Sequence, residues 1–121
     1  MTEYELCFTS AVEVARLVRS RTVSAVEVTR AILDHIDTID NRLNAYCTVA
    51  SDQAIVAAKM VDDTLASGND PGPLCGVPVS IKDLIPTSGI RTTFGSRTQE
   101  HYIPNFDGPL VERLKSAGAV V

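Results

Sequence analysis

Lys82 is the side chain in this sequence that is best placed to do chemistry. It lies in the run GVPVSIKD, residues 76–83, where apolar residues occupy every second position. That alternation predicts a strand. An ammonium group that apolar neighbours desolvate has a lowered pKa and can act as a base near neutral pH, whereas an ordinary surface lysine stays protonated. We therefore expect Lys82 to be a base at the carboxyl end of a strand.

Ser80 offers a nucleophile close to this base. It precedes Lys82 by two positions and would share its strand face, with the two Cα atoms ~6.5 Å apart. A Ser-Lys dyad is therefore conceivable. A nucleophile also needs oriented oxyanion donors, and the sequence contains no GxSxG or SxxK pattern. The dyad is accordingly the weaker alternative.

The elements around the lysine follow an α/β pattern. A strand over 77–81 leads into a loop over 83–106, which is rich in Gly and Pro. Asp107 is expected to cap a helix that ends at Gly118, and a second strand begins at Ala119. The buried face of this helix is expected to hold Leu110, Val111, Leu114 and Ala117. A strand, a helix and a second strand in this order imply that the two strands are parallel. In sheets of this kind, ligands bind beyond the carboxyl ends of the strands.

The first half of the chain is predicted to be helical. Ser10 and Ser24 each precede a glutamate by three residues, which is the capping-box pattern that starts a helix. The helix after Ser24 is expected to end near Asn41, and a further helix is expected over residues 51–68. Their apolar positions are Ala25, Val28, Ile32, Ile36 and Ile39, and then Ala54, Ala58, Val61 and Leu65. Residues 45–49 are expected to form a short buried strand or an extended connector.

These elements predict one α/β domain rather than two. Residues 1–68 form a helical lead-in, and residues 76–121 carry the strand, loop, helix and strand. The helices are amphipathic and too few to be stable without a partner surface. We therefore expect the N-terminal helices to pack on a mixed sheet.

Composition argues against two kinds of partner. The net charge of −4 and the absence of a Lys/Arg cluster argue against nucleic-acid binding, which depends on neutralising phosphates. No stretch approaches the roughly 18 apolar residues that a membrane span needs. The acidic N-terminus lacks the pattern of a signal peptide. We expect a cytoplasmic protein that acts on a small molecule.

The remaining reactive side chains are Cys7, Cys47, Cys75, His35 and His101. The cysteines are odd in number, widely spaced and without a CxxC pair, so we expect no metal site. In a cytosolic chain such cysteines are mostly buried, reduced and structural. We expect His35 to pack at a helix boundary and His101 to lie exposed in a loop.

Three ordered motifs resemble the amidase signature family. They are GPLCGVPVSIKD at 72–83, TTFGS at 92–96 and VERLKSAGA at 111–119. The sequence LNAY at 43–46 also looks like the N-terminal region of that family, so the resemblance covers essentially the whole chain. Three motifs in this order are hard to obtain by chance, whereas GVPxxxKD alone would be a weak signal.

The resemblance implies an enzyme that cleaves amide C–N bonds. Family members use a serine, cis-serine, lysine triad on a mixed sheet flanked by helices, and Lys82 matches the lysine. Its neutral amine would take a proton from the bridging serine, which in turn activates the nucleophilic serine. Backbone donors would stabilise the oxyanion of the acylation step.

A small carboxamide is the substrate that the resemblance implies, with no metal and no organic cofactor. Thr93, Gly95 and Ser96 are candidates for lining the substrate cleft. Hydroxyl groups in loops equally often satisfy the backbone of local turns, so a purely structural role is the alternative for these residues.

The sequence departs from the family in one respect. The Gly/Ser-rich segment that carries both serines is not among residues 1–121. We therefore expect the N-terminal portion of a single amidase domain, with an incomplete fold and no turnover of its own. One alternative is a glutaminase-type subunit of a tRNA-dependent amidotransferase, whose ammonia serves a second polypeptide of the complex. Another alternative is a truncated, non-catalytic remnant or interaction domain, which would expose apolar surface or form a homodimer.

Overall fold

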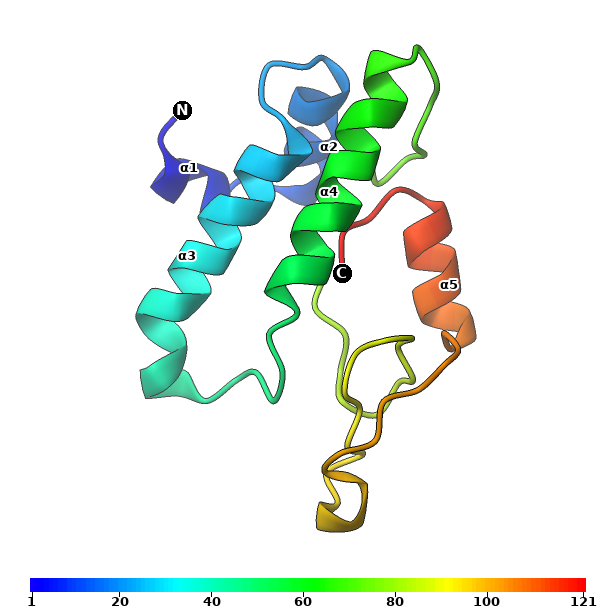
Figure 1. Ribbon diagram of the computed structural model, residues 1–121. Coiled ribbons are helices and arrows are strands. Elements are labelled where there is room, and N and C mark those ends of the chain that lie inside the picture. The colour runs from blue at the N-terminus through cyan, green and yellow to red at the C-terminus, as the bar shows by residue number, and fades with distance from the viewer.

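Five α-helices and one 3-10 turn make up the regular structure, and the computed structural model describes all of residues 1–121 (Figure 1). In chain order they are α1 (Glu3–Cys7), α2 (Ala11–Arg19), α3 (Ala25–Leu43), α4 (Ser51–Ala66), η1 (Arg97–Gln99) and α5 (Pro109–Ser116). The segment between α4 and α5 is otherwise irregular. No helix combines the length and the apolar character that crossing a membrane requires.

Hydroxyl side chains start the first three helices. Thr2 and Ser24 form complete capping boxes at α1 and α3, in which each hydroxyl accepts an N–H from the third helical residue and that residue's carboxylate accepts the N–H of the cap. The Ser10 hydroxyl accepts the Glu13 N–H at α2. The two helices predicted after Ser10 and Ser24 are confirmed. Helix α1 has no counterpart among the predicted elements, because five residues are too few to show helical periodicity.

Helices α3 and α4 lie side by side (Figure 1). The Asp62 carboxylate of α4 accepts the N–H groups of Ala25 and Val26 at 2.7 and 3.2 Å. The first turn of α3 is therefore capped by a neighbouring helix as well as by its own serine. At its other end α3 runs slightly past the predicted end near Asn41, and Asn44 closes it with a left-handed φ of 51°.

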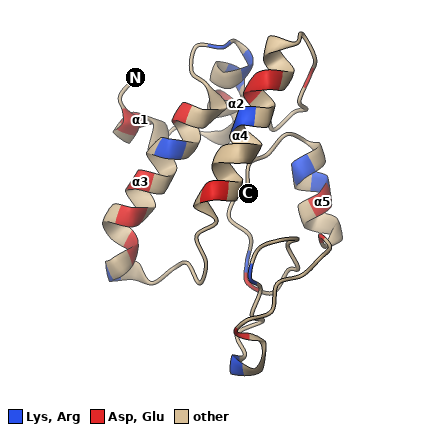
Figure 2. Ribbon diagram, in the orientation of Figure 1, with Lys and Arg blue, Asp and Glu red and all other residues tan.

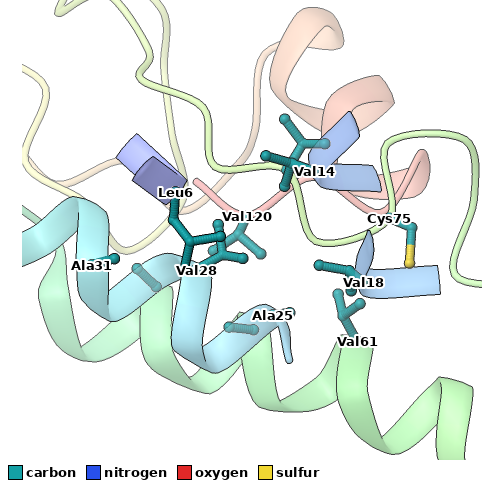
Figure 3. Close-up of a cluster of buried hydrophobic side chains, with 12 residues drawn as sticks. Leu6, Val14, Val18, Ala25, Val28, Ala31, Val61, Cys75 and Val120 are labelled. Atoms are coloured by element: carbon teal, nitrogen blue, oxygen red, sulfur yellow. The ribbon is translucent and has the colours of Figure 1, made fainter. Parts of the chain in front are cut away.

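One cluster of buried apolar side chains joins the helices to the irregular segment (Figure 3). Its members are Leu6, Val14, Val18, Ala25, Val28, Ala31, Ala54, Ala58, Val61, Cys75, Val77 and Val120. Cys75, Val77 and Val120 come from outside the helices. Burying a side chain the size of valine stabilises the fold by roughly 1.5–3 kcal/mol. These three residues therefore attach the second half of the chain to the helical half.

The predicted mixed sheet is not formed. The two segments predicted as strands run parallel, as expected, but they meet in one isolated bridge between Pro78 and Val120. The Val79 N–H donates to the Val120 oxygen at 2.8 Å, and the Val120 N–H donates to the Val77 oxygen at 2.9 Å. Pro78 has no N–H to donate, and no third segment pairs with either neighbour, so the pairing does not extend into strands.

Two predictions about the last helix are also wrong. Asp107 does not cap α5, because Gly108 occupies the N-cap position. The Asp107 carboxylate instead accepts the Ser88 N–H at 2.8 Å and pairs with the Lys115 ammonium at 2.9 Å. Leu110 is 51% exposed rather than buried, since the helix presents only Val111 fully to the interior.

Residues 45–49 form the extended connector between α3 and α4. They contain no bridge to another segment, and Tyr46 and Val49 are 37% and 42% exposed. Of the two predicted forms, a buried strand or a connector, the structure has the connector.

Candidate functional site

Lys82 lies at the end of an extended segment that Val77 anchors in the core. Burial alternates along this segment: Val77 is buried, Val79 and Ile81 are half-buried, and Ser80 and Lys82 are exposed. The predicted alternation is therefore present without a strand. None of the four ion pairs of the chain involves the Lys82 ammonium. The prediction that apolar neighbours desolvate this group is wrong within residues 1–121, because its side chain is open to solvent.

The same segment lines a cavity of about 850 Å³. Helix α3 contributes Ile32, Ile36 and Thr29 to the lining, and α1, α2 and the connector after α3 contribute further residues. The lining is mostly apolar, with Lys82 and Ser80 among its polar members. Pockets that bind small molecules have similar lining and volumes of roughly 300–1,000 Å³. The cavity is therefore of a size and character that suit a small substrate next to the lysine.

Ser80 and Lys82 share the exposed side of the segment and both line this cavity. This placement agrees with the shared strand face expected from their spacing. No hydrogen bond joins the two side chains, and neither group is oriented by a second residue. The Ser-Lys dyad stays the weaker alternative.

Asp83, directly after the lysine, is held by Thr93 and Phe94, ten and eleven positions further along the chain. Its carboxylate accepts the Thr93 N–H at 2.7 Å and also accepts the Thr93 hydroxyl, and its carbonyl oxygen accepts the Phe94 N–H at 2.9 Å. Burial raises the pKa of Asp83, but the two hydrogen bonds from Thr93, the Cys47 thiol and the charge of Arg91 together outweigh it. The net pKa of Asp83 is lowered, so the carboxylate is ionised near neutral pH.

Arg91 links the connector after α3 to the irregular segment. Its guanidinium donates to the Cys47 carbonyl oxygen at 3.2 Å, to the Thr48 hydroxyl at 3.3 Å, and to the Glu100 carbonyl oxygen. In Figure 2 the ribbons of α3, α4 and α5 each carry both basic and acidic residues. The charged residues that line the cavity are Lys82, Asp83 and Arg91.

None of the three residues predicted to line a substrate cleft lines this cavity; Thr92 does. Thr93 is 7% exposed, and its hydroxyl is engaged by Asp83. The Ser96 hydroxyl accepts a backbone N–H at the start of η1. Gly95 follows Thr93 in the same turn and donates its N–H to the Thr93 hydroxyl oxygen at 3.2 Å. These residues have local structural partners, and their contact with substrate stays a prediction.

Asp83 and Arg91 are site residues that the sequence pattern did not single out. The signal for Asp83 was present, because a carboxylate often accepts backbone N–H groups of a turn. Its partner, however, lies ten residues away, and the carbonyls that Arg91 contacts lie nine and 44 residues away. Spacing along a loop does not determine such pairs.

Most predictions for the cysteines and histidines are confirmed, and one, for Cys47, is wrong. Cys75 is buried and Cys7 is partly buried, and burial raises the pKa of both thiols, whereas Cys47 is exposed against expectation. His35 packs edge-on against two aromatic rings of the N-terminal region at centroid distances of 5.6 and 6.3 Å, and His101 is exposed, both as predicted. No three His, Cys, Asp or Glu side chains gather closely enough to hold a metal ion.

Two curated proteins, both subunits of glutamyl-tRNA(Gln) amidotransferase, share close sequence similarity with this chain. The protein from Carboxydothermus hydrogenoformans is 47% identical over 116 residues, which are 96% of this chain and 24% of that protein. The protein of the same name from Geobacter sulfurreducens is 50% identical over 101 residues, which are 84% of this chain and 21% of that protein. The chain thus spans about a quarter of the length of the relatives that it matches.

Comparison with solved structures identifies the same family. The native peptide amidase from Stenotrophomonas maltophilia superimposes with a TM-score of 0.87 at 31% identity, over 93% of this chain and 23% of that one. The profile of the Amidase family matches residues 27–121, which include Lys82 and the whole irregular segment. The resemblance inferred from the three motifs is thereby confirmed, and the chain belongs to the amidase family.

Proposed function

We propose that this chain is the lysine-bearing part of an amidase-family protein that serves as the amide-cleaving subunit of a glutamyl-tRNA(Gln) amidotransferase. The observation that carries this proposal is the 47% identity to the Carboxydothermus hydrogenoformans protein over 96% of the chain. The peptide amidase of the same fold is 31% identical. The sequence thus favours the amidotransferase alternative over a general amidase as the main function.

Lys82 would serve as the base of amide cleavage. In the triad that the motifs imply, a serine oxygen attacks the carboxamide carbon, its proton passes to the bridging serine, and the proton of that serine passes to the Lys82 amine. The C–N bond breaks, ammonia leaves with one of these protons, and the acyl-serine ester is then hydrolysed by water. The two serines are expected in a Gly/Ser-rich segment that is not among residues 1–121.

The placement of the lysine supports this role. Lys82 has no ion-pair partner in the chain and lines a cavity that has room for a small carboxamide. Its amine is therefore free to contact a reacting group that another segment brings to the cavity. Further contacts from that segment would also supply the desolvation that the exposed lysine lacks here.

A hybrid protein tests the proposal. This chain replaces the matching quarter of the Carboxydothermus hydrogenoformans protein, and the hybrid is assayed for ammonia release from glutamine with the other subunits of that complex. Lys82→Ala is expected to lower kcat by about 10²–10⁴-fold, the usual contribution of a general base. Lys59→Ala, which removes an exposed lysine of α4, is the matched control. Full activity of Lys82→Ala in a folded hybrid would overturn the role of Lys82 as base.

A general amidase is the second candidate function. The specific observation in its favour is the TM-score of 0.87 with the peptide amidase, so the same fold also occurs in an enzyme named as an amidase. The same hybrid distinguishes them. Glutamine hydrolysis that supports amide formation on glutamyl-tRNA favours the amidotransferase type. Hydrolysis of simple carboxamides, with no transfer to tRNA, favours the amidase.

A protein partner follows from the main proposal. The name of the Carboxydothermus hydrogenoformans protein makes it one subunit of an amidotransferase. In this chain Phe8 and Val12, in the N-terminal part, are 65% and 82% exposed. Apolar surface of this kind suits contact with another polypeptide. A monomer in solution, both with and without the other subunits, would argue against it.

A further inference from the structure

The backbone around Lys82 is anchored on both sides. On the N-terminal side, the Val79 N–H donates to the Val120 oxygen at 2.8 Å, which holds the extended segment to the end of the chain. On the C-terminal side, the anchor begins at the very next residue, Asp83. Only Ser80 and Ile81 lie between Val79 and the lysine. The backbone on each side of Lys82 is thus attached to another part of the chain.

The second attachment is a clamp made by one carboxylate and one threonine. Asp83 accepts both the N–H and the hydroxyl of Thr93, so that both carboxylate oxygens are occupied by one residue. Thr93 is 7% exposed and the neighbouring Thr92 is 2% exposed, so the partner side is fixed by packing. A charged acceptor with two donors forms stronger hydrogen bonds than a neutral pair. The clamp therefore holds Asp83 against a rigid part of the loop.

The clamp also includes the main chain of the loop. The Phe94 N–H donates to the Asp83 carbonyl oxygen at 2.9 Å, and Phe94 adopts a left-handed φ of 53°. A bulky residue rarely takes this conformation, and it persists only where the surroundings determine it. Residue 83 is thus attached through its carbonyl as well as through its side chain, while the Lys82 amine stays unengaged at the cavity.

We infer that Asp83 and Thr93 are a positioning pair that fixes the path of Lys82 into the cavity. Asp83 itself does not contact the reacting atoms in this role; its two carboxylate oxygens each accept a hydrogen bond from Thr93, and it acts through the backbone of the residue before it. The inference rests on the proposed function of Lys82 as the base. Positioning matters for a base because a displacement of about 1 Å can slow a reaction by 10²-fold.

The first test uses the 121-residue chain alone. Backbone ¹⁵N relaxation is measured at Lys82 and Leu84 in the parent chain, in Thr93→Val, which removes the hydroxyl at nearly constant volume, and in Thr93→Ser, which keeps it. Thr93→Val is expected to increase the motion of both amides, and Thr93→Ser to restore the parent values. Unchanged relaxation in Thr93→Val would overturn the inference.

Asp107→Asn is the matched control for this test. Asp107 also accepts a backbone N–H in the same irregular segment, from Ser88, but it lies 25 residues further along the chain than Lys82 and pairs with Lys115 on α5. It is expected to change thermal stability without changing relaxation at residue 82. An equal effect of Asp107→Asn on residue 82 would show general loosening of the loop and would contradict a specific clamp.

The second test uses the hybrid with the Carboxydothermus hydrogenoformans protein. Thr93→Val and Asp83→Asn are expected to lower kcat by about tenfold to 10²-fold with little change in KM, measured well below the unfolding temperature. Thr93→Ser is expected to recover most of the rate. Because the two residues act as a unit, the double variant should lose little more than either single variant.

The outcomes separate this inference from the proposed function. If Lys82→Ala abolishes turnover while Thr93→Val and Asp83→Asn keep the parent kcat, the positioning pair is refuted and the base stands. If Lys82→Ala keeps full activity, the proposed function fails first, and the relaxation measurements then decide whether the clamp orders residue 82 at all.

Discussion

The helical half of the chain and the irregular half are held together in different ways. In residues 1–68 the first three helices each begin at a hydroxyl side chain that lies next to them in sequence, as Thr2 and Ser24 do in their capping boxes, and only α4 has no side-chain cap. In residues 72–121 the backbone is held by side chains that reach across ten, 19 or 44 positions, from Asp83, Asp107 and Arg91. The difference shows that the starts of the helices are specified mostly by neighbouring residues, with Asp62 as a distant addition at α3, whereas the irregular half depends on contacts between distant residues.

The two halves meet at a seam of tight backbone contacts. Gly76 packs between the helices through Val18 and Ala25, and its N–H donates to the Gly118 oxygen at 2.9 Å. Cys75, the residue before it, is fully buried in the helical core. The irregular half therefore takes its shape from the surface that the helices provide.

The largest effect is expected at this seam. Gly76 and Gly95 share a φ of +70°, but a Cβ at Gly76 would meet Ala25 and Val18 atoms at 2.9 Å, whereas a Cβ at Gly95 would meet nothing within 4 Å. Gly95→Ala isolates the strain of the left-handed conformation and is expected to lower the free energy of unfolding by about 1–2 kcal/mol.

Gly76→Ala adds steric overlap to the same strain, and we expect a loss of about 2–4 kcal/mol. Urea unfolding followed by circular dichroism measures both variants. Equal losses for the two glycines would mean that the helical half does not depend on close contact with the irregular half, and the comparison between them would fail.

An intermediate effect is expected within the helical half. Asp62 of α4 accepts two N–H groups of the first turn of α3, so Asp62→Ala removes a cap that a neighbouring helix supplies. We expect the free energy of unfolding to fall by about 1–2 kcal/mol. Asp63→Ala, one position along, is the control because its side chain is exposed and accepts no such bond. If both variants keep the parent stability, the serine cap alone specifies the start of α3.

The smallest effect is expected from acid. The pKa of Asp83 is lowered in the folded chain, so the stability from its ionised form is present above its ordinary pKa of about 3.9 and is lost as pH falls through the lower folded value. The protection of the Thr93 amide against exchange, relative to its intrinsic rate, is expected to decrease as pH falls below this ordinary pKa and through the lower folded value, where the carboxylate takes up a proton.

The matched control is Asp83→Asn. In this variant the acid dependence of the Thr93 amide should disappear, whereas the acid dependence of the helices that are capped by glutamates should stay. The pKa of Glu27 is also lowered, first by its hydrogen bond to the Ser24 backbone, so the helical half has an acid response of its own. A Thr93 amide that keeps its acid dependence in Asp83→Asn would show that another group controls the clamp.

The elements with local signals were predictable. Hydroxyl caps and apolar residues at helical spacing place α2, α3 and α4, because a helix closes its hydrogen bonds within four residues. The same logic is wrong for Asp107, because its carboxylate accepts the Ser88 N–H and pairs with Lys115 in the last turn of α5 instead of capping the first turn of that helix. The alternation over 77–81 predicts extended backbone correctly, but a sheet also requires partners, and the bridge at Pro78 is the only pairing that this segment makes.

The candidate site also has one part that the sequence predicts and one part that it does not. Lys82 is identifiable from the run in which it lies, and the three motifs place the chain in the amidase family that the profile then matches. The clamp on the next residue is not identifiable in that way. Asp83 and Thr93 are both common loop residues, and their pairing depends on how the intervening turn folds back.

The sequence alone determined helices α2 to α5, the extended run and the choice of Lys82 as the candidate residue, because capping, periodicity and motif order are properties of neighbouring residues. Only the tertiary structure decided that the extended run forms a single bridge instead of a sheet, that Lys82 is exposed beside a cavity, and that Thr93 holds Asp83. The physical reason is that hydrogen bonds and burial between distant residues depend on the packing surface, and that surface exists only once the helices have assembled around Val18, Val28 and Val120.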